Sequence, residues 1–507
     1  MRVQLSVIDT GAQDLGLCRG FVFALPRALG PAGDALVDAV RQAVEGVVRE
    51  WILLRGVPVW QAESRTWAID TSTHARPTFS FTTATVDKPY HQAINLSQPL
   101  EPLSSSSTSG EMHPFVAAHF RHAETPTTMQ QHAKKKHPLL SVHIVRFVDA
   151  VSLGISAPHG LFDGTGLAHV LAGITAGLRD DVEWVAPPVH ESNPLSEARR
   201  ALMSTESTAL AGDEQERPPV LLGWTPFSVL ALVALLMQAL WDKWRHGATL
   251  RYAFISRDAV DALVDEVKGE VKVETSGKEW VSTGDVLTAW VLKNFHGDDA
   301  SATGSVLCSP VFNIRSLLAT SSTDLAEPLA SHTGNAVVPY SFSPQPIRLS
   351  HLAATSVGAL ALVHRRTLAG CKTLPWLRDT LLAGDRVTQG GKMPMLPLRD
   401  FPWVVDRARG TTRWIVSNHM SSFAALRIPR AATFVDGEGD ADDDWDGRAG
   451  DLPLLAYYRS VAAPLDLNST FALQLSDDGL FVVASARRAR WDALMRAIDD
   501  LDRRAKS

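Results

Sequence analysis

The amino-acid sequence predicts an α/β fold in two regions. Strand-like alternation and helical periodicity interleave over the first 180 residues, and both resume from residue 250 onward. Between them, residues 191–219 are polar, which is typical of a long connection. A length of 507 residues, 45% of them apolar and 21% charged, is enough for several globular domains with large cores. We therefore expect one domain at 1–190, a crossover at 191–249 and a second domain at 250–507.

The first region combines a long helix, a hairpin and a second helix. Over residues 34–54 apolar side chains recur on one helical face. Residues 139–148 and 151–157 are apolar and strand-like, and the short connection between them predicts a hairpin. After Asp163, apolar residues return at a spacing of three to four, which predicts a helix: Leu167, Val170, Leu171, Ile174 and Leu178.

The second region alternates strands and helices to the end of the chain. Strands are predicted at 250–256, 306–313, 335–342, 413–417, 471–475 and 480–486. Helices are predicted at 258–267, from Ser282 onward, at 349–368 and at 490–501. The stretches 104–110 and 438–446, one rich in Ser, Thr and Gly and the other acidic, are predicted loops.

Charge and cysteine content exclude several classes of function. A net charge of -6 with no basic stripe argues against nucleic-acid binding. The three cysteines are widely spaced, so they form neither a disulfide framework nor a metal pair, which suits a reducing compartment. The histidines between residues 113 and 137 lack the spacing of a zinc motif. We therefore expect no metal site. The first residues do not resemble a secretory signal, so we expect a cytoplasmic protein.

The sequence does not decide the role of one apolar segment, residues 220–241. Residues 220–241 contain no charged side chain, and Pro226 interrupts them. Their length is that of a membrane span, but a span here would place the two α/β regions on opposite sides of a membrane. A buried helix and a helix lying on a membrane surface both remain compatible with a site built by the two regions.

The strongest functional signal is a His-x-x-x-Asp-Gly motif directly after the predicted hairpin. It places His159 at the end of a buried strand and Asp163 and Gly164 at the start of a helix. An Asp at that position can cap the helix and fix the turn. Because an imidazole titrates near neutrality, a rigidly held His is suited to act as a general base. The alternative interpretation is a histidine at the edge of the core beside a helix cap.

With these motifs placed, the chain resembles the BAHD superfamily of CoA-dependent acyltransferases, in particular its fungal, trichothecene acetyltransferase-like branch. The resemblance follows the order of short motifs along almost the whole chain. They are Leu5-Ser6-Val7-Ile8-Asp9, His159 to Gly164, Ser282 to Trp290, Asn313-Ile314-Arg315, Gly334-Asn335 and Val416-Ser417-Asn418. The second family signature, Asp-Phe-Gly-Trp-Gly, is decayed: the nearest segment, residues 434–439, keeps one Asp and two Gly. That signature is structural in the family, so its decay weakens the resemblance more than it argues against catalysis.

The resemblance implies two similar domains, each a mixed sheet flanked by helices, with an active-site channel at their interface. His159 would be the general base. Asp163 would orient it by pairing with Arg315, and Gly164 and Gly166 would allow a tight turn and close approach of the substrate. Two further residues at a strand end, Ser417 and Asn418, are candidates for stabilising the oxyanion, against the simpler interpretation that they only end the strand. No covalent intermediate and no bound cofactor is expected, because acyl-CoA, with acetyl-CoA as the default, is the co-substrate.

The predicted function is therefore transfer of an acyl group, acetyl by default, from CoA to a hydroxyl or amine of a small secondary metabolite. The apolar segment 220–241 favours a lipophilic acceptor or association with a membrane surface, and we expect a monomer. Two alternatives stay open: a condensation-type enzyme that takes its acyl group from a carrier protein, and a non-catalytic member of the fold. Condensation-type enzymes have two adjacent histidines in this motif, whereas Pro158 stands at the first position here. The intact set of His159, Asp163 and Arg315 argues against the non-catalytic alternative.

Overall fold

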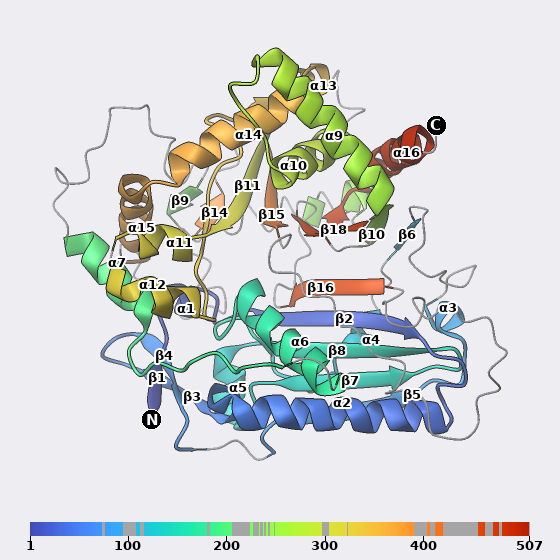
Figure 1. Cartoon of the computed structure of the whole chain (residues 1–507), viewed down its shortest axis with the longest axis vertical. Helices are drawn as coiled ribbons and strands as arrows, with labels where there is room; N and C mark the ends of the chain where they lie inside the picture. The colour runs from blue at the N-terminus through green and yellow to red at the C-terminus, as the bar shows by residue number, and fades with distance from the viewer. Residues whose placement is uncertain are drawn as a thin grey trace.

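The computed structural model contains two mixed sheets, each with helices packed against it (Figure 1). It describes the chain except for residues 74–76, 95–107, 112–115, 180–182, 205–223, 227–232, 234–236, 238–239, 242–243, 248, 297–303, 322, 390–402, 406–410, 419–454, 462–469, 476–478 and 506–507. The smaller sheet lies in the lower half of Figure 1 and the larger sheet in the upper half. The predicted α/β class, with mixed sheets flanked by helices, is confirmed.

The lower sheet has five strands in the order β16-β2-β8-β7-β5. Their bounds are β2 Gly16–Ala24, β5 Ser80–Thr85, β7 Ser141–Arg146, β8 Ala150–Pro158 and β16 Leu455–Val461. Only β5 and β7 are parallel, and β7 and β8 form the predicted hairpin. All nine residues of β8 are buried. The strand that leads to His159 is therefore fixed along its whole length by packing.

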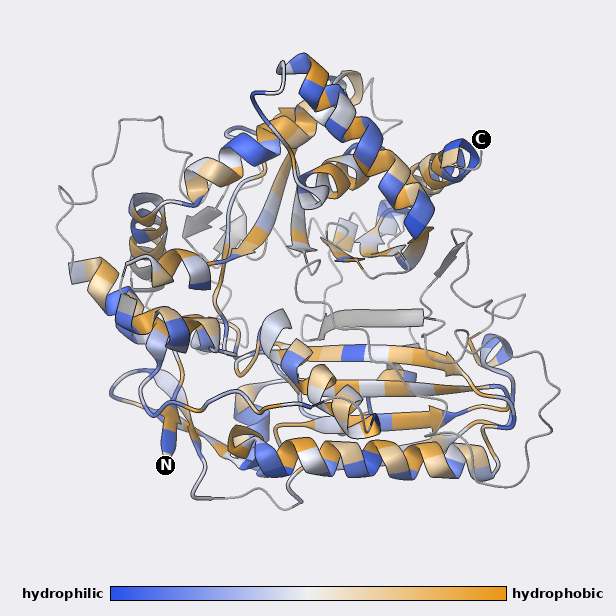
Figure 2. Cartoon of the chain, in the orientation of Figure 1, coloured by the Kyte–Doolittle hydropathy of each residue, from blue (hydrophilic) through white to orange (hydrophobic). Residues whose placement is uncertain are grey.

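Two helices, α2 (Pro31–Glu50) and α6 (Gly164–Leu178), pack against each other beside the lower sheet (Figure 1). In α2, Pro31 takes the first helical position, where its missing N–H costs nothing. Apolar side chains on one face of α2 are buried, and Figure 2 shows them alternating with polar ones along the helix. The helix was predicted to reach residue 54, but it ends at Glu50 because Trp51 leaves the helical conformation (φ -98°, ψ 89°).

The upper sheet has eight strands: seven in the order β12-β11-β15-β17-β18-β10-β6, with β13 also paired to β11. Their bounds are β6 Thr108–Glu111, β10 Thr249–Ser256, β11 Ser305–Asn313, β12 Val337–Pro339, β13 Ile347–Arg348, β15 Thr411–Asn418, β17 Thr470–Leu475 and β18 Gly479–Ala486. The neighbours β11, β15 and β17 are parallel, and the other pairs are antiparallel. The helices around this sheet are α9 Arg257–Glu274, α10 Thr283–Asn294, α14 Val357–Cys371 and α16 Arg488–Ala505.

Each sheet ends with a strand that comes from the opposite end of the chain. The late strand β16 pairs with β2, so that Leu455 lies opposite Val22. The early strand β6 pairs with β10, with Thr108 opposite Phe254. The stretch 104–110 was predicted to be a loop, and that prediction is wrong for residues 108–110, which gain backbone partners in this sheet. The two halves are therefore joined by backbone pairing as well as by the chain between them.

Smaller elements complete the fold. The first part of the chain contains β1 Arg2–Gln4, α1 Val7–Gly11, η1 Ile52–Arg55, β3 Val57–Gln61, β4 Thr66–Asp70, α3 Tyr90–Ala93, α4 Val116–Phe120 and α5 Met129–Lys135. The second part contains α7 Pro194–Ser204, β9 Trp224–Pro226, α11 Arg315–Ala319, η3 Thr323–Leu325, α12 Ala326–Ala330, α13 Leu349–Ala354, α15 Leu374–Gln389 and β14 Trp403–Val405. Strands β1, β4 and β3 form a separate three-stranded sheet, and β9 pairs with β14.

Two further predicted elements differ from the structure. The helix expected at 349–368 is two helices, because Thr355 is extended (ψ 139°) and Ser356 caps α14 by accepting a hydrogen bond from the Ala359 N–H. The apolar segment 220–241 is not one helix, because Trp224–Pro226 forms a strand. Among the described residues, no helix has the length and apolar character needed to cross a membrane. The acidic stretch 438–446 and the decayed signature at 434–439 lie outside the described residues, and the domain boundaries remain predictions.

Candidate active site

His159 lies in the turn between β8 and α6 and is held by backbone and side-chain hydrogen bonds. Its backbone N–H donates to the Leu15 carbonyl at 2.8 Å. Its Nδ1 lies 2.9 Å from the Phe162 carbonyl oxygen. Because a carbonyl oxygen only accepts, the proton of the neutral imidazole belongs on Nδ1, and the lone pair is on Nε2. Burial lowers the pKa of His159 below its usual 6.5, which favours this neutral form at physiological pH.

Asp163 binds the start of α6 and a cation. One carboxylate oxygen, Oδ1, accepts hydrogen bonds from the backbone N–H groups of Thr165 (2.9 Å) and Gly166 (3.1 Å) and so caps α6. The other, Oδ2, lies 2.9 Å from Nη2 of Arg315 and accepts a hydrogen bond from the Ala336 N–H at 3.3 Å. The pair expected between Asp163 and Arg315 is thus present, with both side chains buried.

Arg315 ties the motif to a loop of the other half. Its Nε donates to the His332 carbonyl at 2.7 Å, and Nη2 donates to the Gly334 carbonyl. Its backbone N–H donates to Oδ1 of Asn313 at 2.9 Å, which fixes the start of α11. The guanidinium therefore joins the loop before β12 to Asp163 at the start of α6, while the Arg315 backbone N–H binds the end of β11.

The two glycines after Asp163 lie in the first turn of α6. Gly164 is the first residue of α6. A Cβ on Gly166 would lie 2.2 Å from the Thr333 carbonyl oxygen and 2.6 Å from Phe162. A backbone carbonyl of the other half therefore approaches Gly166 closely, which requires a glycine, and the approach of a substrate stays a prediction.

Two residues near His159 have a role that the sequence did not assign. The side-chain amide of Asn335 donates to the His159 carbonyl at 2.6 Å and to Oδ1 of Asp9 at 3.1 Å. Both Asp9 and Asn335 belong to the short motifs of the resemblance, but nothing in their spacing indicates that they meet.

Ser417 and Asn418 end β15, opposite Ala472 and Leu473 of β17, and Ser417 is partly exposed. Among the described residues, no group of three or more His, Cys, Asp or Glu side chains is arranged to hold a metal ion.

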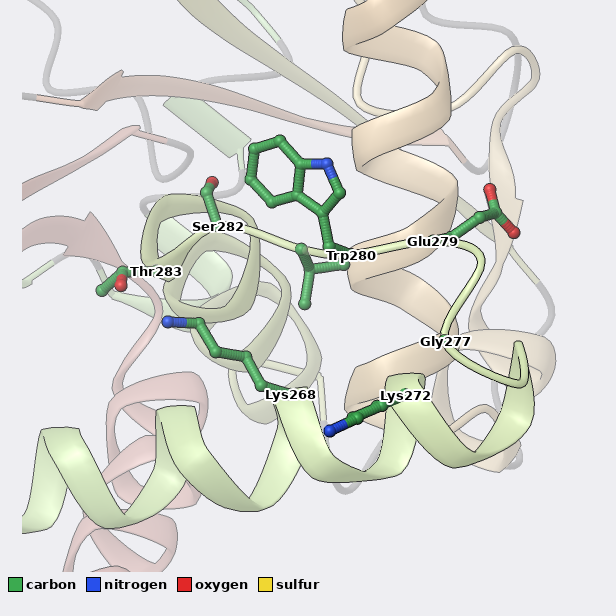
Figure 3. Close-up of a pocket in the computed structure, with 8 residues that line it drawn as sticks. Lys268, Lys272, Gly277, Glu279, Trp280, Ser282 and Thr283 are labelled. Atoms are coloured by element: carbon green, nitrogen blue, oxygen red, sulfur yellow. The ribbon is translucent and has the colours of Figure 1, made fainter.

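A basic pocket of about 580 Å³ lies between α9 and the start of α10 (Figure 3). Lys268 and Lys272 extend into it from α9, and Ser282 and Thr283 line it at the start of α10. Glu279 points away from the lysines, and its carboxylate is engaged by Arg366 at 2.5 Å.

An aromatic ring also lines this pocket. The indole of Trp280 is 61% exposed, and the guanidinium of Arg365 lies 3.7 Å from the centroid of the ring. The pocket therefore combines two lysine side chains with a largely exposed aromatic ring. The sequence did not single it out, because exposed lysines four residues apart are common on helices.

Similarity to solved structures decides the fold. The chain aligns over 98% of its length, and over 97% of the other chain, with F. graminearum TRI101 complexed with coenzyme A and deoxynivalenol, at a TM-score of 0.58 and 13% identity. Vinorine synthase aligns over 97% and 91% of the two chains, at a TM-score of 0.52 and 14% identity. The chain has the fold of the BAHD acyltransferases. No family model matches the sequence.

Curated relatives of this BAHD-fold chain come from fungi. The O-acetyltransferase PaAT-2 of Phomopsis amygdali is 26% identical over 251 residues, which are 48% of this chain and 49% of that protein. The transcriptional regulator calD of Penicillium decumbens is 29% identical over 210 residues, 39% of this chain and 40% of that protein. The chain thus spans less than two thirds of the length of these relatives. The predicted resemblance to the fungal branch of the BAHD superfamily is confirmed by these similarities in fold and sequence.

The pair of Asp163 and Arg315 gives the first prediction. Arg315→Met should lower the free energy of unfolding by about 3–5 kcal/mol, because it leaves a buried carboxylate without its cation. Asp163→Asn keeps a capping side chain and removes the charge. In the double variant, the loss should be clearly smaller than the sum of the two single losses, as measured by urea unfolding. Additive losses would show that the pair does not couple the two residues.

Proposed function

We propose that the protein transfers an acyl group from acyl-CoA to a hydroxyl or amine of a small molecule, with His159 as the general base. The observation that carries the proposal is the contact of His159 Nδ1 with the Phe162 carbonyl, from which we assign the proton to Nδ1 and the lone pair to Nε2 as the proton acceptor. The likeness to TRI101, whose structure holds coenzyme A and deoxynivalenol, supports a CoA thioester as donor and a secondary metabolite as acceptor. Acetyl is the default acyl group because PaAT-2 is an O-acetyltransferase.

The proposed reaction needs no covalent intermediate on the enzyme. Nε2 of His159 removes the proton of the acceptor while its oxygen or nitrogen attacks the thioester carbonyl. The resulting tetrahedral oxyanion collapses, the carbon–sulfur bond breaks, and the CoA thiolate leaves. The imidazolium then returns its proton, so that free CoA thiol and the acylated acceptor are the products.

Other residues of the site support the base in this proposal. Asp163 and Arg315 act as positioning residues, since Asp163 caps the helix that follows the turn carrying His159 and Arg315 binds Asp163. Gly164 and Gly166 let α6 start next to the loop that Arg315 holds. Ser417 and Asn418 remain candidates for hydrogen bonding to the oxyanion across a channel between domains 1–190 and 250–507.

We assign the phosphate end of the co-substrate to the basic pocket between α9 and α10. Lys268 and Lys272 supply positive charge, and the exposed Trp280 ring offers a surface on which a purine base can stack. A nucleotide thioester has both chemistries, whereas an acyl group on a carrier protein lacks the purine. The pocket therefore favours free acyl-CoA over the carrier-dependent alternative.

The non-catalytic alternative draws its support from calD, a relative described as a transcriptional regulator. The net charge of -6 and the absence of a basic stripe do not favour DNA binding by this chain. The complete hydrogen-bonding set around His159 favours catalysis, because a scaffold without activity would not need an imidazole held in one tautomer.

We further propose that the protein is a cytoplasmic monomer that touches membrane surfaces through the segment around residues 220–241. Five of its described residues are helical, apolar and 50% to 76% exposed: Val233, Met237, Leu240, Trp241 and Trp244. Their spacing places them on one face of a helix. The rings of Trp241 and Trp244 lie 5.1 Å apart, and paired indoles on an exposed apolar face are suited to the lipid interface.

Replacing the base should abolish transfer. His159→Ala should lower kcat by about 10²–10⁴-fold, because proton removal from the acceptor is lost. The measurement is free-thiol release from acetyl-CoA and longer acyl-CoAs across a panel of alcohols and amines, with His351→Ala, an exposed histidine on α13, as control. Because the pKa of His159 is lowered from 6.5, the acid limb of kcat/KM should lie below pH 6.5. Acceptor-dependent release that survives in His159→Ala would exclude this base.

Reversing charge in the basic pocket should weaken co-substrate binding without slowing the chemistry. The double variant Lys268→Glu/Lys272→Glu should raise KM for acetyl-CoA about tenfold at low salt, since two attractions to phosphate become repulsions, and leave kcat within about threefold. An acetyl thioester without phosphates, S-acetyl-N-acetylcysteamine, should be used equally by both proteins. Lys134→Glu/Lys135→Glu on α5 is the matched control. An unchanged KM for acetyl-CoA would remove the pocket from the proposal.

Removing the paired indoles should abolish membrane binding. Wild-type protein is expected to sediment with liposomes, and Trp241→Ser/Trp244→Ser should stay in the supernatant, because the largest apolar groups of the face are gone. Trp280→Ser removes an equally exposed indole from a different surface and should sediment like wild type. If wild-type protein does not sediment with lipid, the membrane proposal fails while the acyl-transfer proposal stands.

A further inference from the structure

Three distant segments of the chain meet at the backbone of His159. The segment after α1 supplies the Leu15 carbonyl, which accepts from the His159 N–H at 2.8 Å. The loop between α12 and β12 supplies Asn335, whose side-chain amide donates to the His159 carbonyl at 2.6 Å. The peptide groups on both sides of this residue are thus held, one by each half of the fold.

Asn335 is itself held by a buried carboxylate. Oδ1 of Asp9 accepts from the Asn335 backbone N–H at 2.5 Å and from its side-chain amide at 3.1 Å. Oδ2 of Asp9 accepts from the N–H and the hydroxyl of Ser6, both at 2.7 Å, within the capping box of α1. Four hydrogen bonds therefore saturate a carboxylate that is 0% exposed.

This arrangement allows only one orientation of the Asn335 side chain. If the amide turned over, its oxygen would face the carboxylate of Asp9 and the carbonyl of His159, and both of these groups are acceptors. Asp9 therefore orients the side chain of Asn335 so that its NH₂ group faces the His159 carbonyl. A neutral side chain at residue 9 with its own N–H groups could not impose this orientation as strongly.

The charge on Asp9 is not a source of folding stability. Burial raises the pKa of this carboxyl above its usual 3.8, although the hydrogen bonds from Asn335 and Ser6 oppose the rise. A raised pKa means that the folded state prefers the protonated group more than the unfolded chain does. The stabilisation from a protonated Asp9 is lost as pH rises through the folded pKa, so at neutral pH the ionised group disfavours folding.

We propose that Asp9 and Asn335 are positioning residues of the acyl transfer, which hold the His159 carbonyl and thereby aim Nε2 of the imidazole. This inference rests on the proposed function. The side chain of His159 hydrogen-bonds within its own turn, to Phe162. The contact with Asn335 anchors this turn directly to a loop of the other half, and so it fixes the base relative to groups on the upper sheet.

The test compares kcat with KM. Asn335→Ala and Asp9→Asn should each lower kcat at least tenfold, and KM for acetyl-CoA should change less than threefold, because the base is misaimed while the co-substrate pocket is untouched. Asp9→Asn should also lower the melting temperature, because an amide has one acceptor oxygen where the carboxylate has two, which bind Ser6 and Asn335. The control is Tyr340→Phe, which removes another buried hydrogen bond, from the Tyr340 hydroxyl to His364 at 2.7 Å. This control should lower the melting temperature and leave kcat unchanged.

A second measurement does not depend on activity. In protein carrying ¹³C-labelled histidine, the resonance that is missing in His159→Ala identifies this imidazole. It should shift and change its titration midpoint in Asn335→Ala and Asp9→Asn, and stay in place in Tyr340→Phe. If wild type shows no transfer with any substrate, the proposed function fails, and this resonance alone decides the positioning. An unmoved resonance, or a kcat within twofold of wild type in both variants, would overturn the inference.

Discussion

The guanidinium of Arg315 is the group on which the geometry of the candidate site depends. It is planar and permanently charged, so its buried donors bind acceptors in fixed directions. The Asp163 carboxylate and the Gly334 carbonyl bind Nη2, and the His332 carbonyl binds Nε. These acceptors belong to the start of α6 and to the loop before β12. Satisfying one cation therefore fixes how the two halves meet at the turn that carries His159.

Apolar packing and polar contacts both hold the two halves together, and they contribute in different ways. Phe254, Ala472 and Phe481 of the upper sheet belong to the same buried cluster as the core of the lower sheet. These contacts are non-directional and supply most of the favourable free energy. The polar contacts around His159 supply direction, because hydrogen bonds to buried carboxylates and carbonyls tolerate little displacement. The site thus lies where an apolar interface gives way to a network of fixed donors and acceptors.

Local patterns in the sequence predicted the local parts of the structure. The β7–β8 hairpin, α6 and the cap at Asp163 follow from periodicity and capping chemistry within a few residues, and they are observed. The contact between Asp9 and Asn335 is not local, since it joins residues 326 positions apart in the sequence. The strand β6 was also missed, because its edge partner lies in the other half of the chain. The apolar spacing did not predict the break between α13 and α14 at Thr355, because this spacing continues across it.

The exchange of edge strands affects how the chain folds during its synthesis. As the chain leaves the ribosome, β2 is made early, but its partner β16 appears only after most of the upper half has been synthesised. Until then, the outer edge of β2 has unpaired backbone groups, and such an edge can recruit strands from other nascent chains. The closing step must also bring together residues very far apart along the chain, and contacts of this kind form slowly. Successful folding in the cell should therefore depend on chaperones that shield this edge until translation is nearly finished.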